Sequence, residues 1–428
     1  MKKIISLFII LVFIVSCTTV NAIEETSQSE AFIRGVWVSS VLNLDFPSAP
    51  GLSDAALRAE IDSIVKTCVN TGMNTVFFQV RPCADALYNS AVFPVSTYLT
   101  GRSSYDRLSF DPLEYFIKKA HESGIKLHAW LNPYRVTRNP KEMSAISELS
   151  PARRHPEYLL HASDGNYFFD PALPEVQQLI LDGVREIIEN YDVDGIHFDD
   201  YFYPDSSYDD SKSFAAYGSG YSSVGEWRTE NVNTLVRRAH ELIKGLDPSV
   251  EFGISPRGIW ANDYDNSKGS ATRGSGSLTD IHCDSLRFIK EGWVDYICPQ
   301  IYWNIGYSIA DYQILVPWWI GAVSGTNVKL YIGMADYRSA EAASGNVWQG
   351  TAELQRQLNL NKTYPQISGE VHFRYGSIAK TPALYEFYRQ AYGRLQQSSA
   401  APNAAPDISF QDLLNNNIVN IMHKILSA

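Results

Sequence analysis

The chain has 428 residues, of which 45% are hydrophobic and 19% are charged. This composition excludes a largely disordered chain, because enough apolar side chains are present to build a core. The formal net charge of -11 argues against nucleic acid as a partner, since such binding depends on Lys and Arg neutralising phosphates, and a neutral ligand fits better.

The N-terminal residues have the layout of a secretory signal. Two lysines precede an apolar run over residues 4–15, which is too short to cross a bilayer comfortably, and Ser16 and Cys17 follow it. The segment Ile14-Val15-Ser16-Cys17 also resembles a bacterial lipobox. We therefore expect cleavage before Cys17, lipid on that cysteine, and attachment to the membrane of the cell envelope. The alternative is an ordinary signal that is cleaved near Ala22.

Between Ala31 and Tyr392, short β-rich runs alternate with amphipathic stretches, a pattern that indicates βα units around a parallel sheet. The predicted strands begin at Phe32, Asn74, Ile125, Val193, Val250, Val294, Val328 and Ile367. The predicted helices cover residues 54–70, 111–123, 174–191, 227–246, 278–291, 311–323, 351–360 and 382–392. Eight strands, each followed by a helix, predict an α/β fold of the (β/α)₈ or TIM-barrel type.

The barrel is predicted to occupy residues 31–392, after a signal over 1–16 and a tether over 17–30. Residues 393–428 form a proline-containing linker and a weakly amphipathic tail whose role stays open. The loops from helix to strand are short, whereas several loops from strand to helix are long. Because those long loops gather at the C-terminal face of a barrel, we expect the functional site there.

The fourth predicted strand carries the strongest catalytic candidate. Ile196 and Phe198 are large and apolar and should face the helices, so that His197, Asp199 and Tyr201 point into the barrel. Glycoside cleavage needs one protonated and one ionised carboxyl group, and Asp199 at the rim suits the ionised role. Arginines at strand ends would be its cationic neighbours: Arg81, Arg135, Arg257 and Arg338. The alternative is that Asp199 only pairs with Arg257 or Arg81 to fill the barrel mouth.

The proton donor is less clearly marked. In order of preference, the candidates are Asp200, Asp45, Asp336 and Glu370. Glu370 stands last because it lies early in its strand, and Asp45 could instead cap the turn that follows the first strand.

A set of aromatic and polar residues with inward parity or at strand ends predicts a sugar subsite, although each alone could equally be a core residue. Besides the aspartates, the set comprises Trp37, Gln79, Arg81, Trp130, Asn132, Tyr134, Arg135, His197, Tyr201, Tyr203, Arg257, Ser255, Gln300, Tyr302 and Trp303.

No metal or cofactor is indicated by the sequence. His128, His197 and His372 stand singly on their strands, and no lysine-containing phosphate loop is present. The cysteines after the signal lack zinc spacing, so we expect buried thiols or a single disulfide at Cys68, Cys83, Cys283 and Cys298.

Several long motifs resemble the bacterial glycosyl hydrolase-like family ten. They are RGVWV, LDFPS, NPYR, HPEYL, DGIHFDDYFYP, SPRGIW and CPQIYW, spread over most of residues 31–392. The resemblance implies a (β/α)₈ fold shared with retaining glycosidases and a secreted or lipoprotein enzyme of the envelope. Because some members of that family act on the glycan strands of peptidoglycan, the resemblance also implies this polymer as a candidate substrate.

The segment GIHFDD also resembles the fourth strand of amylase-like and galactosidase-like barrels, where the aspartate at the position of Asp199 is the nucleophile. It resembles the chitinase-like strand as well, but Tyr201 stands where that family has its acid glutamate and His197 replaces an aspartate. Three functions follow as hypotheses: an envelope glycoside hydrolase, a non-catalytic carbohydrate-binding lipoprotein, and a metal-dependent polysaccharide esterase or deacetylase. The first is preferred, with no nucleic acid as partner and the oligomeric state left open.

Overall fold

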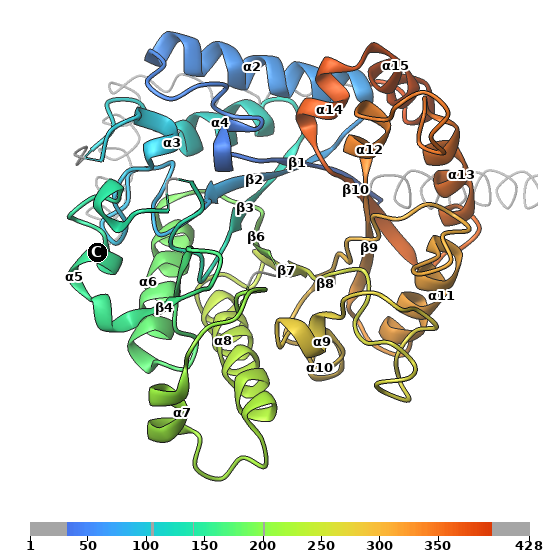
Figure 1. The fold of residues 1–428 in the computed structure, drawn as a ribbon. Helices are drawn as coiled ribbons and strands as arrows, with labels where there is room; N and C mark the ends of the chain where they lie inside the picture. The colour runs from blue at the N-terminus through green and yellow to red at the C-terminus, as the bar shows by residue number, and fades with distance from the viewer. Residues whose placement is uncertain (1–31, 104–106, 140, 200–201, 396–428) are drawn as a thin grey trace, which may run out of the picture. The chain divides into compact units, whose positions relative to one another are not determined.

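A computed structural model describes residues 32–103, 107–139, 141–199 and 202–395. Eight parallel strands close into a barrel, in the order β1-β10-β9-β8-β7-β6-β3-β2 (Figure 1). They are β1 Ile33–Val38, β2 Thr75–Arg81, β3 Lys126–Leu131, β6 Gly195–Asp199, β7 Glu251–Ser255, β8 Tyr296–Ile297, β9 Lys329–Met334 and β10 Ile367–His372. All eight strands expected from the sequence are therefore present, and the predicted TIM barrel is confirmed.

Helices surround the barrel in every direction in Figure 1. The longer ones are α2 Asp54–Thr71, α4 Pro112–His121, α6 Pro174–Asn190, α8 Val224–Leu246, α11 Tyr312–Val323, α13 Ala352–Asn361 and α15 Pro382–Ala391. Shorter ones are α3 Thr97–Thr100, α5 Pro151–Arg154, α7 Ser211–Tyr217, α9 Ser277–Asp280, α10 Ser285–Glu291, α12 Asp336–Ala340 and α14 Tyr375–Lys380. Seven of the eight predicted helices are each found as one main helix.

The helix predicted over residues 278–291 is instead two short helices, α9 and α10. His282 interrupts them with a φ of 57°, a left-handed conformation that an α-helix does not accommodate. Asp284 then begins α10, because its side chain accepts a hydrogen bond from the backbone N–H of Arg287. The break places α9 at the C-terminal end of the barrel, where it contributes to the cavity described below.

Two apolar clusters follow from the alternation of side chains along the strands. The outer cluster packs the strands against the helices and includes Ile196 and Phe198. The inner cluster fills the barrel with aromatic rings, among them Trp37, Phe77 and Tyr296. Glycine makes room for these rings: a Cβ at Gly253 would lie 2.1 Å from the ring of Tyr296. The barrel is therefore a packed core, and a ligand can enter only from its ends.

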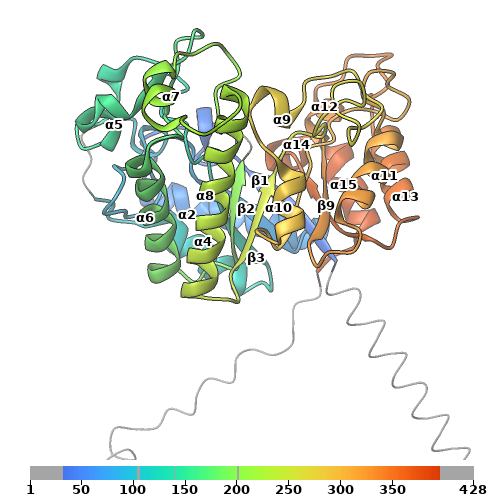
Figure 2. The same ribbon diagram turned by 90° about the horizontal axis from the view of Figure 1, so that it is seen from below.

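The connections are longer at one end of the barrel. In the side view of Figure 2, α5, α7 and α9 lie along one edge of the barrel, above the long helices α6 and α8. A small antiparallel pair that the sequence did not indicate, β4 Leu159–His161 and β5 Tyr167–Phe169, lies in the loop between β3 and α6. This loop architecture places the irregular segments at the carboxyl ends of the strands.

Residues 396–428 of the predicted linker and tail lie outside the described residues. Within the part of the chain that the structure describes, no helix is long and apolar enough to cross a membrane. The predicted signal and Cys17 lie outside the described residues.

Candidate active site

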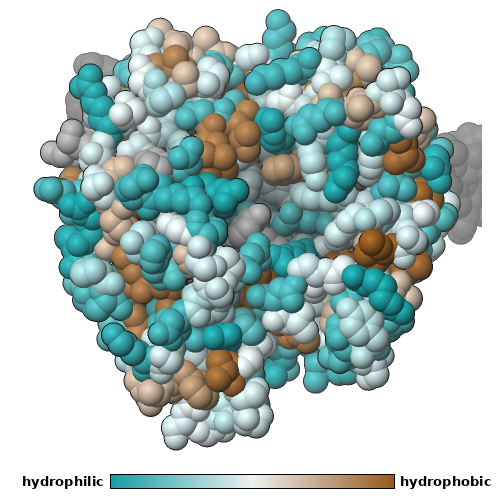
Figure 3. Space-filling model, in the orientation of Figure 1, coloured by the Kyte–Doolittle hydropathy of each residue, from teal (hydrophilic) through white to brown (hydrophobic). Residues whose placement is uncertain are grey.

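The C-terminal face of the barrel is hollowed near its centre, as the space-filling view shows (Figure 3). A cavity of about 470 Å³ lies on this face. Loops after four consecutive strands line it. The lining residues are Asp205 after β6; Arg257, Gly258, Ser275 and Asp280 after β7; Gln300, Tyr302 and Trp303 after β8; and Tyr337 and Arg338 on α12, after β9. Arg257, Gln300, Tyr302 and Trp303 were expected at the site from the sequence.

Arg257 is the ionic centre of the cavity. Its guanidinium forms ion pairs with Asp205 and, at 3.5 Å, with Asp280. Ser275 joins the group, because its hydroxyl accepts from Arg257 and donates to Asp280. Asp205, Asp280 and Ser275 were not identified from the sequence. Asp205 and Ser275 lie in loops and Asp280 ends the four-residue helix α9, so no periodicity assigns a direction to these side chains.

Aromatic rings form one wall of the cavity. The ring of Tyr302 stacks on Phe373 at 5.8 Å and meets the edge of Tyr337 at 6.0 Å. Gly258 makes room for Trp303, because a Cβ there would lie 2.8 Å from the indole ring. Flat rings beside hydrogen-bonding amides and carboxylates are the surfaces on which sugar C–H groups and hydroxyls bind.

Asp199 ends β6, and its side chain is 6% exposed. The amide of Asn132 donates from Nδ2 to Asp199 Oδ2 at 2.9 Å, and Gln79 Nε2 donates to Asn132 Oδ1 at 2.6 Å. Gln79 Oε1 in turn accepts three hydrogen bonds of 3.0 Å from the end of β1: the Ser39 hydroxyl and the backbone N–H groups of Ser40 and Val41. The direction of every hydrogen bond in this relay is therefore fixed, and the carboxylate of Asp199 receives a donor.

A second chain of hydrogen bonds runs along the barrel axis below Asp199. Trp37 Nε1, which can only donate, lies 3.2 Å from His197 Nε2, so this nitrogen accepts and the proton of His197 is on Nδ1. Nδ1 lies 3.0 Å from the hydroxyl of Tyr296, which is also 3.0 Å from His128 Nδ1. Burial lowers the pKa of His197 well below its usual value, so the imidazole is neutral.

His197 was expected to bind sugar, but it is fully buried inside the barrel. Trp37, Gln79, Trp130 and Asn132 are likewise buried beneath the cavity. The structure thus brings these residues together with Asp199, in positions that support the site rather than line its cavity.

Arg81 departs from the expected direction because β2 contains a bulge. The pairing with β3 shifts by one residue between Gln79 and Arg81, so Arg81 stands opposite Leu131, a residue of the outer cluster. One extra residue reverses the inward and outward alternation. The guanidinium of Arg81 consequently stacks on Phe93, 3.6 Å from the ring centre, and does not reach the barrel mouth.

Other expected residues also lie away from the cavity. The rings of Tyr134 and Tyr203 belong to the outer cluster, and Arg135 Nε donates to the carbonyl of Pro82 at 2.7 Å. Asp200 and Tyr201 lie outside the described residues. Tyrosines and arginines after a strand end were assigned to the mouth by position, but once the strand ends its alternation no longer fixes where a side chain points.

Two candidate proton donors are bound within the protein. Asp45 accepts from Arg374 at 2.6 Å, from the N–H of Gly376 at 2.8 Å and from the N–H of Ser39 at 3.0 Å. Burial raises the pKa of Asp45, and Arg374 opposes that shift. Asp45 therefore fastens the first loop to the end of β10.

Asp336 lies between the barrel and α15. It is fully buried, and its two oxygens are bonded to Tyr388 and, at 3.1 Å, to His372 Nδ1. Glu370 faces the same layer and accepts from Tyr392 at 2.6 Å. Both carboxyl groups hold the last helix on the barrel, and neither lines the cavity.

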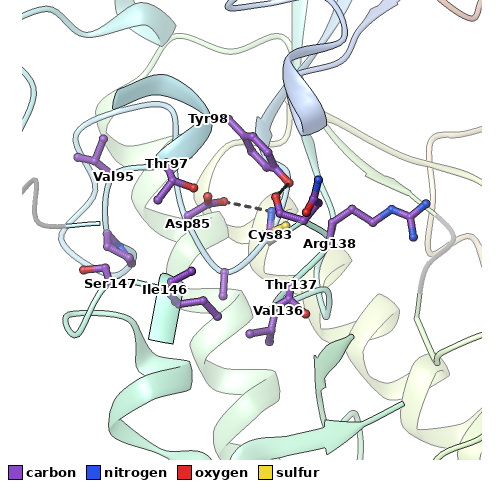
Figure 4. A pocket seen from close by; sticks show the side chains of 14 residues that line it. Cys83, Asp85, Val95, Thr97, Tyr98, Val136, Thr137, Arg138, Ile146 and Ser147 are labelled. Atoms are coloured by element: carbon purple, nitrogen blue, oxygen red, sulfur yellow. Dashed lines mark hydrogen bonds between the residues drawn. The ribbon is translucent and has the colours of Figure 1, made fainter. Parts of the chain in front are cut away.

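Two further cavities do not provide a comparable site. One of about 40 Å³ lies beside the loop after β2, too small for a sugar; Figure 4 shows Cys83, Asp85 and Tyr98 around it, with the Cys83 N–H donating to Asp85. Burial raises the pKa of the Cys83 thiol to about 12, so it is unreactive at neutral pH. The other, of about 810 Å³, lies at the N-terminal end, beside Glu251 and Lys329. Barrel enzymes carry their chemistry at the opposite end.

Among the described residues, no group of three or more His, Cys, Asp or Glu side chains is arranged to hold a metal ion. Cys68, Cys83 and Cys298 are buried thiols, which was one of the two alternatives expected from the sequence.

Comparison with known proteins agrees with this architecture. Glycosyl hydrolase YngK of Bacillus subtilis is 39% identical over 363 residues, which span 83% of this chain and 70% of that protein. Glycosyl hydrolase DigH of Escherichia coli is 37% identical over 371 residues, 82% of this chain and 84% of that protein. The glycoside hydrolase domain of PgaB (BpsB) from Bordetella bronchiseptica superposes with a TM-score of 0.53 at 12% identity, covering 85% of this chain and 99% of that domain, and shows a shared fold. Because the model of the family described as glycosyl hydrolase-like 10 matches residues 32–349, the chain belongs to that family of carbohydrate-acting hydrolases.

Proposed function

We propose that this protein is a glycoside hydrolase of the bacterial cell envelope that cleaves O-glycosidic bonds in the glycan strands of peptidoglycan. The observation that carries the proposal is the fixed orientation of the Asp199 carboxylate by Asn132 and Gln79. This carboxylate ends the strand whose following loop brings Asp205 to the aromatic cavity. Membership of a glycosyl hydrolase-like family supports the reaction class.

Asp199 is proposed to act as the ionised carboxylate. A hydrogen bond from Asn132 fixes the direction of the carboxylate, which can then stabilise or attack the positively charged sugar carbon that develops as the bond breaks. Such fixed orientation is effective because the protein does not have to reorganise during the reaction.

The proton donor is proposed to be Asp200. Asp45 and Asp336, the other candidates from the sequence, are held by Arg374 and by Tyr388 with His372, respectively. Neither lines the cavity. Asp200 itself lies outside the described residues, so this assignment rests on its place directly after Asp199.

The envelope location is proposed from the N-terminal residues. Replacement Cys17→Ser should release the protein from the membrane fraction, because no cysteine then stands at the end of the lipobox-like segment to carry lipid. Membrane association unchanged by Cys17→Ser would contradict the lipid anchor without affecting the proposed reaction.

The reaction is tested by incubating purified glycan strands, freed of peptides, with the protein and identifying the products by mass. We expect Asp199→Asn and Asp200→Asn to abolish product, whereas Asp336→Asn should lower thermal stability and leave each folded molecule active. Unchanged turnover by Asp199→Asn would refute the mechanism. If the wild-type protein shows no turnover but binds glycan, and Trp303→Ala abolishes that binding, the protein is instead a carbohydrate-binding lipoprotein.

A further inference from the structure

The charges around the cavity are distributed unevenly with respect to strand order. Its two acids, Asp205 and Asp280, come from the loops after β6 and β7. Arg338 comes from α12, after β9, and the aromatic and amide residues of the loop after β8 lie between them in the barrel order β6-β7-β8-β9. The cavity therefore has an acidic side and a cationic side, separated by an aromatic wall.

On the acidic side of the cavity the carboxylates outnumber the cation. Arg257 contacts both Asp205 and Asp280, so one guanidinium faces two carboxylates. Among the described residues that line this side, no cation is left over for an anionic ligand. A negatively charged sugar substituent placed there would be repelled, which restricts such a group to the other side of the cavity.

On the cationic side, the guanidinium of Arg338 lies beside aromatic rings. Its guanidinium carbon lies 5.6 Å from the ring centre of Tyr337 and 5.9 Å from that of Trp348. In the described part of the chain no carboxylate oxygen lies within 4.0 Å of it, although the chain as a whole is acidic. Its Nε is buried and has no hydrogen-bond partner among the described residues.

An unmatched donor of this kind is costly unless a ligand supplies the acceptor. A buried polar group without a partner loses its hydration without compensation, and the planar fork of arginine matches a carboxylate with two parallel hydrogen bonds. The backbone N–H of Arg338 donates to the carbonyl of Ala335 at 3.1 Å, which fixes the turn that carries the side chain. This turn places Arg338 in the lining of the cavity.

We propose that Arg338 is a specificity residue that binds the carboxylate of an acidic sugar, whose ring stacks on the aromatic wall formed by Tyr302, Trp303 and Tyr337. The inference rests on the proposed glycosidase function. The carboxylate can belong to the lactyl ether of a muramic acid or to a hexuronic acid, and both offer the same planar anion. Gln300, whose amide donates to the carbonyl of Ser255 at 2.8 Å, presents its remaining polar atoms beside the same wall.

The test compares the same glycan with and without its negative charge. Peptide-free oligosaccharides of alternating N-acetylglucosamine and N-acetylmuramic acid are used as such and after conversion of their carboxylates to amides; hyaluronan oligosaccharides supply the hexuronic acid. Wild-type protein should lose roughly 10- to 100-fold in kcat/KM when its acidic substrate is amidated, as expected for a charge-assisted hydrogen bond. The acidic glycan that is cleaved identifies the source of the carboxylate.

Arg338→Gln should show the same loss on the acidic glycan and no further loss on the amidated one, while Arg338→Lys should retain part of the preference. Arg389→Gln is the matched control, because Arg389 lies on the surface of α15 with Glu386 as its partner. A wild-type preference for the acidic glycan that persists in a folded Arg338→Gln protein would overturn the proposal, as would equal cleavage of acidic and amidated chains by the wild type.

Binding measurements separate this proposal from the proposed reaction. Calorimetric titration of Asp199→Asn with each oligosaccharide reports the affinity in the absence of turnover. If the wild-type protein cleaves neither glycan but binds the acidic one roughly 10- to 100-fold more tightly, and this preference is lost in Arg338→Gln, the proposed hydrolase activity is refuted and the carboxylate site is supported. Equal affinity for both glycans would refute the site.

Discussion

Replacement Gln79→Glu tests the relay that orients Asp199. The two side chains have the same shape, and a carboxylate can still accept the hydrogen bonds from Ser39, Ser40 and Val41. It cannot donate to Asn132 Oδ1 as the amide does at 2.6 Å. We expect the amide of Asn132 to turn over, donate to the new carboxylate and present its oxygen to Asp199.

The magnitude follows from the hydrogen bond that Asp199 loses. A hydrogen bond to a charged group contributes about 1.5–3 kcal/mol, and if the transition state alone loses it, kcat falls roughly 10- to 100-fold. KM should change little, because Gln79 is fully buried and does not contact a substrate in the cavity. The assay is a steady-state measurement of kcat and KM on peptide-free glycan strands, with thermal unfolding measured alongside.

The matched control is Gln177→Glu on α6. Gln177 is also a buried amide, but it donates to the carbonyl of Pro171 at 3.1 Å and not to a residue of the relay. The replacement should lower the unfolding temperature without lowering kcat of the folded protein. The reasoning is refuted if Gln79→Glu keeps kcat within twofold of the wild type, or if Gln177→Glu reduces kcat equally.

Three further predictions concern the barrel interior. Tyr296→Phe removes the hydroxyl between His128 and His197 and leaves buried nitrogens without a partner, so the free energy of unfolding should fall by about 2–4 kcal/mol in urea titrations; no loss would contradict the hydrogen-bonded column. Burial lowers the pKa of His128 from 6.5 to about 4, so between these pH values the unfolded chain binds more protons than the folded chain. The free energy of unfolding should therefore fall by about 3 kcal/mol as the pH falls from 7 to 4. The same titrations on His128→Asn should show a correspondingly weaker pH dependence. Arg81→Met replaces a buried guanidinium that stacks on Phe93 and should leave kcat unchanged while stability stays equal or rises by about 1 kcal/mol; a loss of kcat would place Arg81 at the site after all.

The pattern of the sequence was sufficient to predict the barrel and the inward direction of the side chains of His197 and Asp199. Eight β-rich runs alternating with amphipathic stretches have few other solutions, and the large apolar residues Ile196 and Phe198 left the inside of the barrel to His197 and Asp199. The same parity explains why Gln79, Trp130 and Asn132 are found beneath the cavity.

The lining of the cavity was predicted only in part. Arg257, Gln300, Tyr302 and Trp303 lie within two to six residues of the ends of β7 and β8, and they were expected at the C-terminal face because they follow predicted strands. Asp205 lies in the loop after β6 and Asp280 ends the short helix α9, and no local pattern relates them to Arg257, with which the fold pairs them.

Period-2 alternation is a local property, so the sequence by itself determined the barrel, its C-terminal face and the inward direction of Asp199. Only the tertiary structure showed the bulge in β2 that turns Arg81 toward Phe93, because the residues of β3 decide the pairing that a bulge interrupts. It also showed that Asp45 and Asp336 are held by Arg374 and His372, since the partners of a buried carboxylate come from distant parts of the chain.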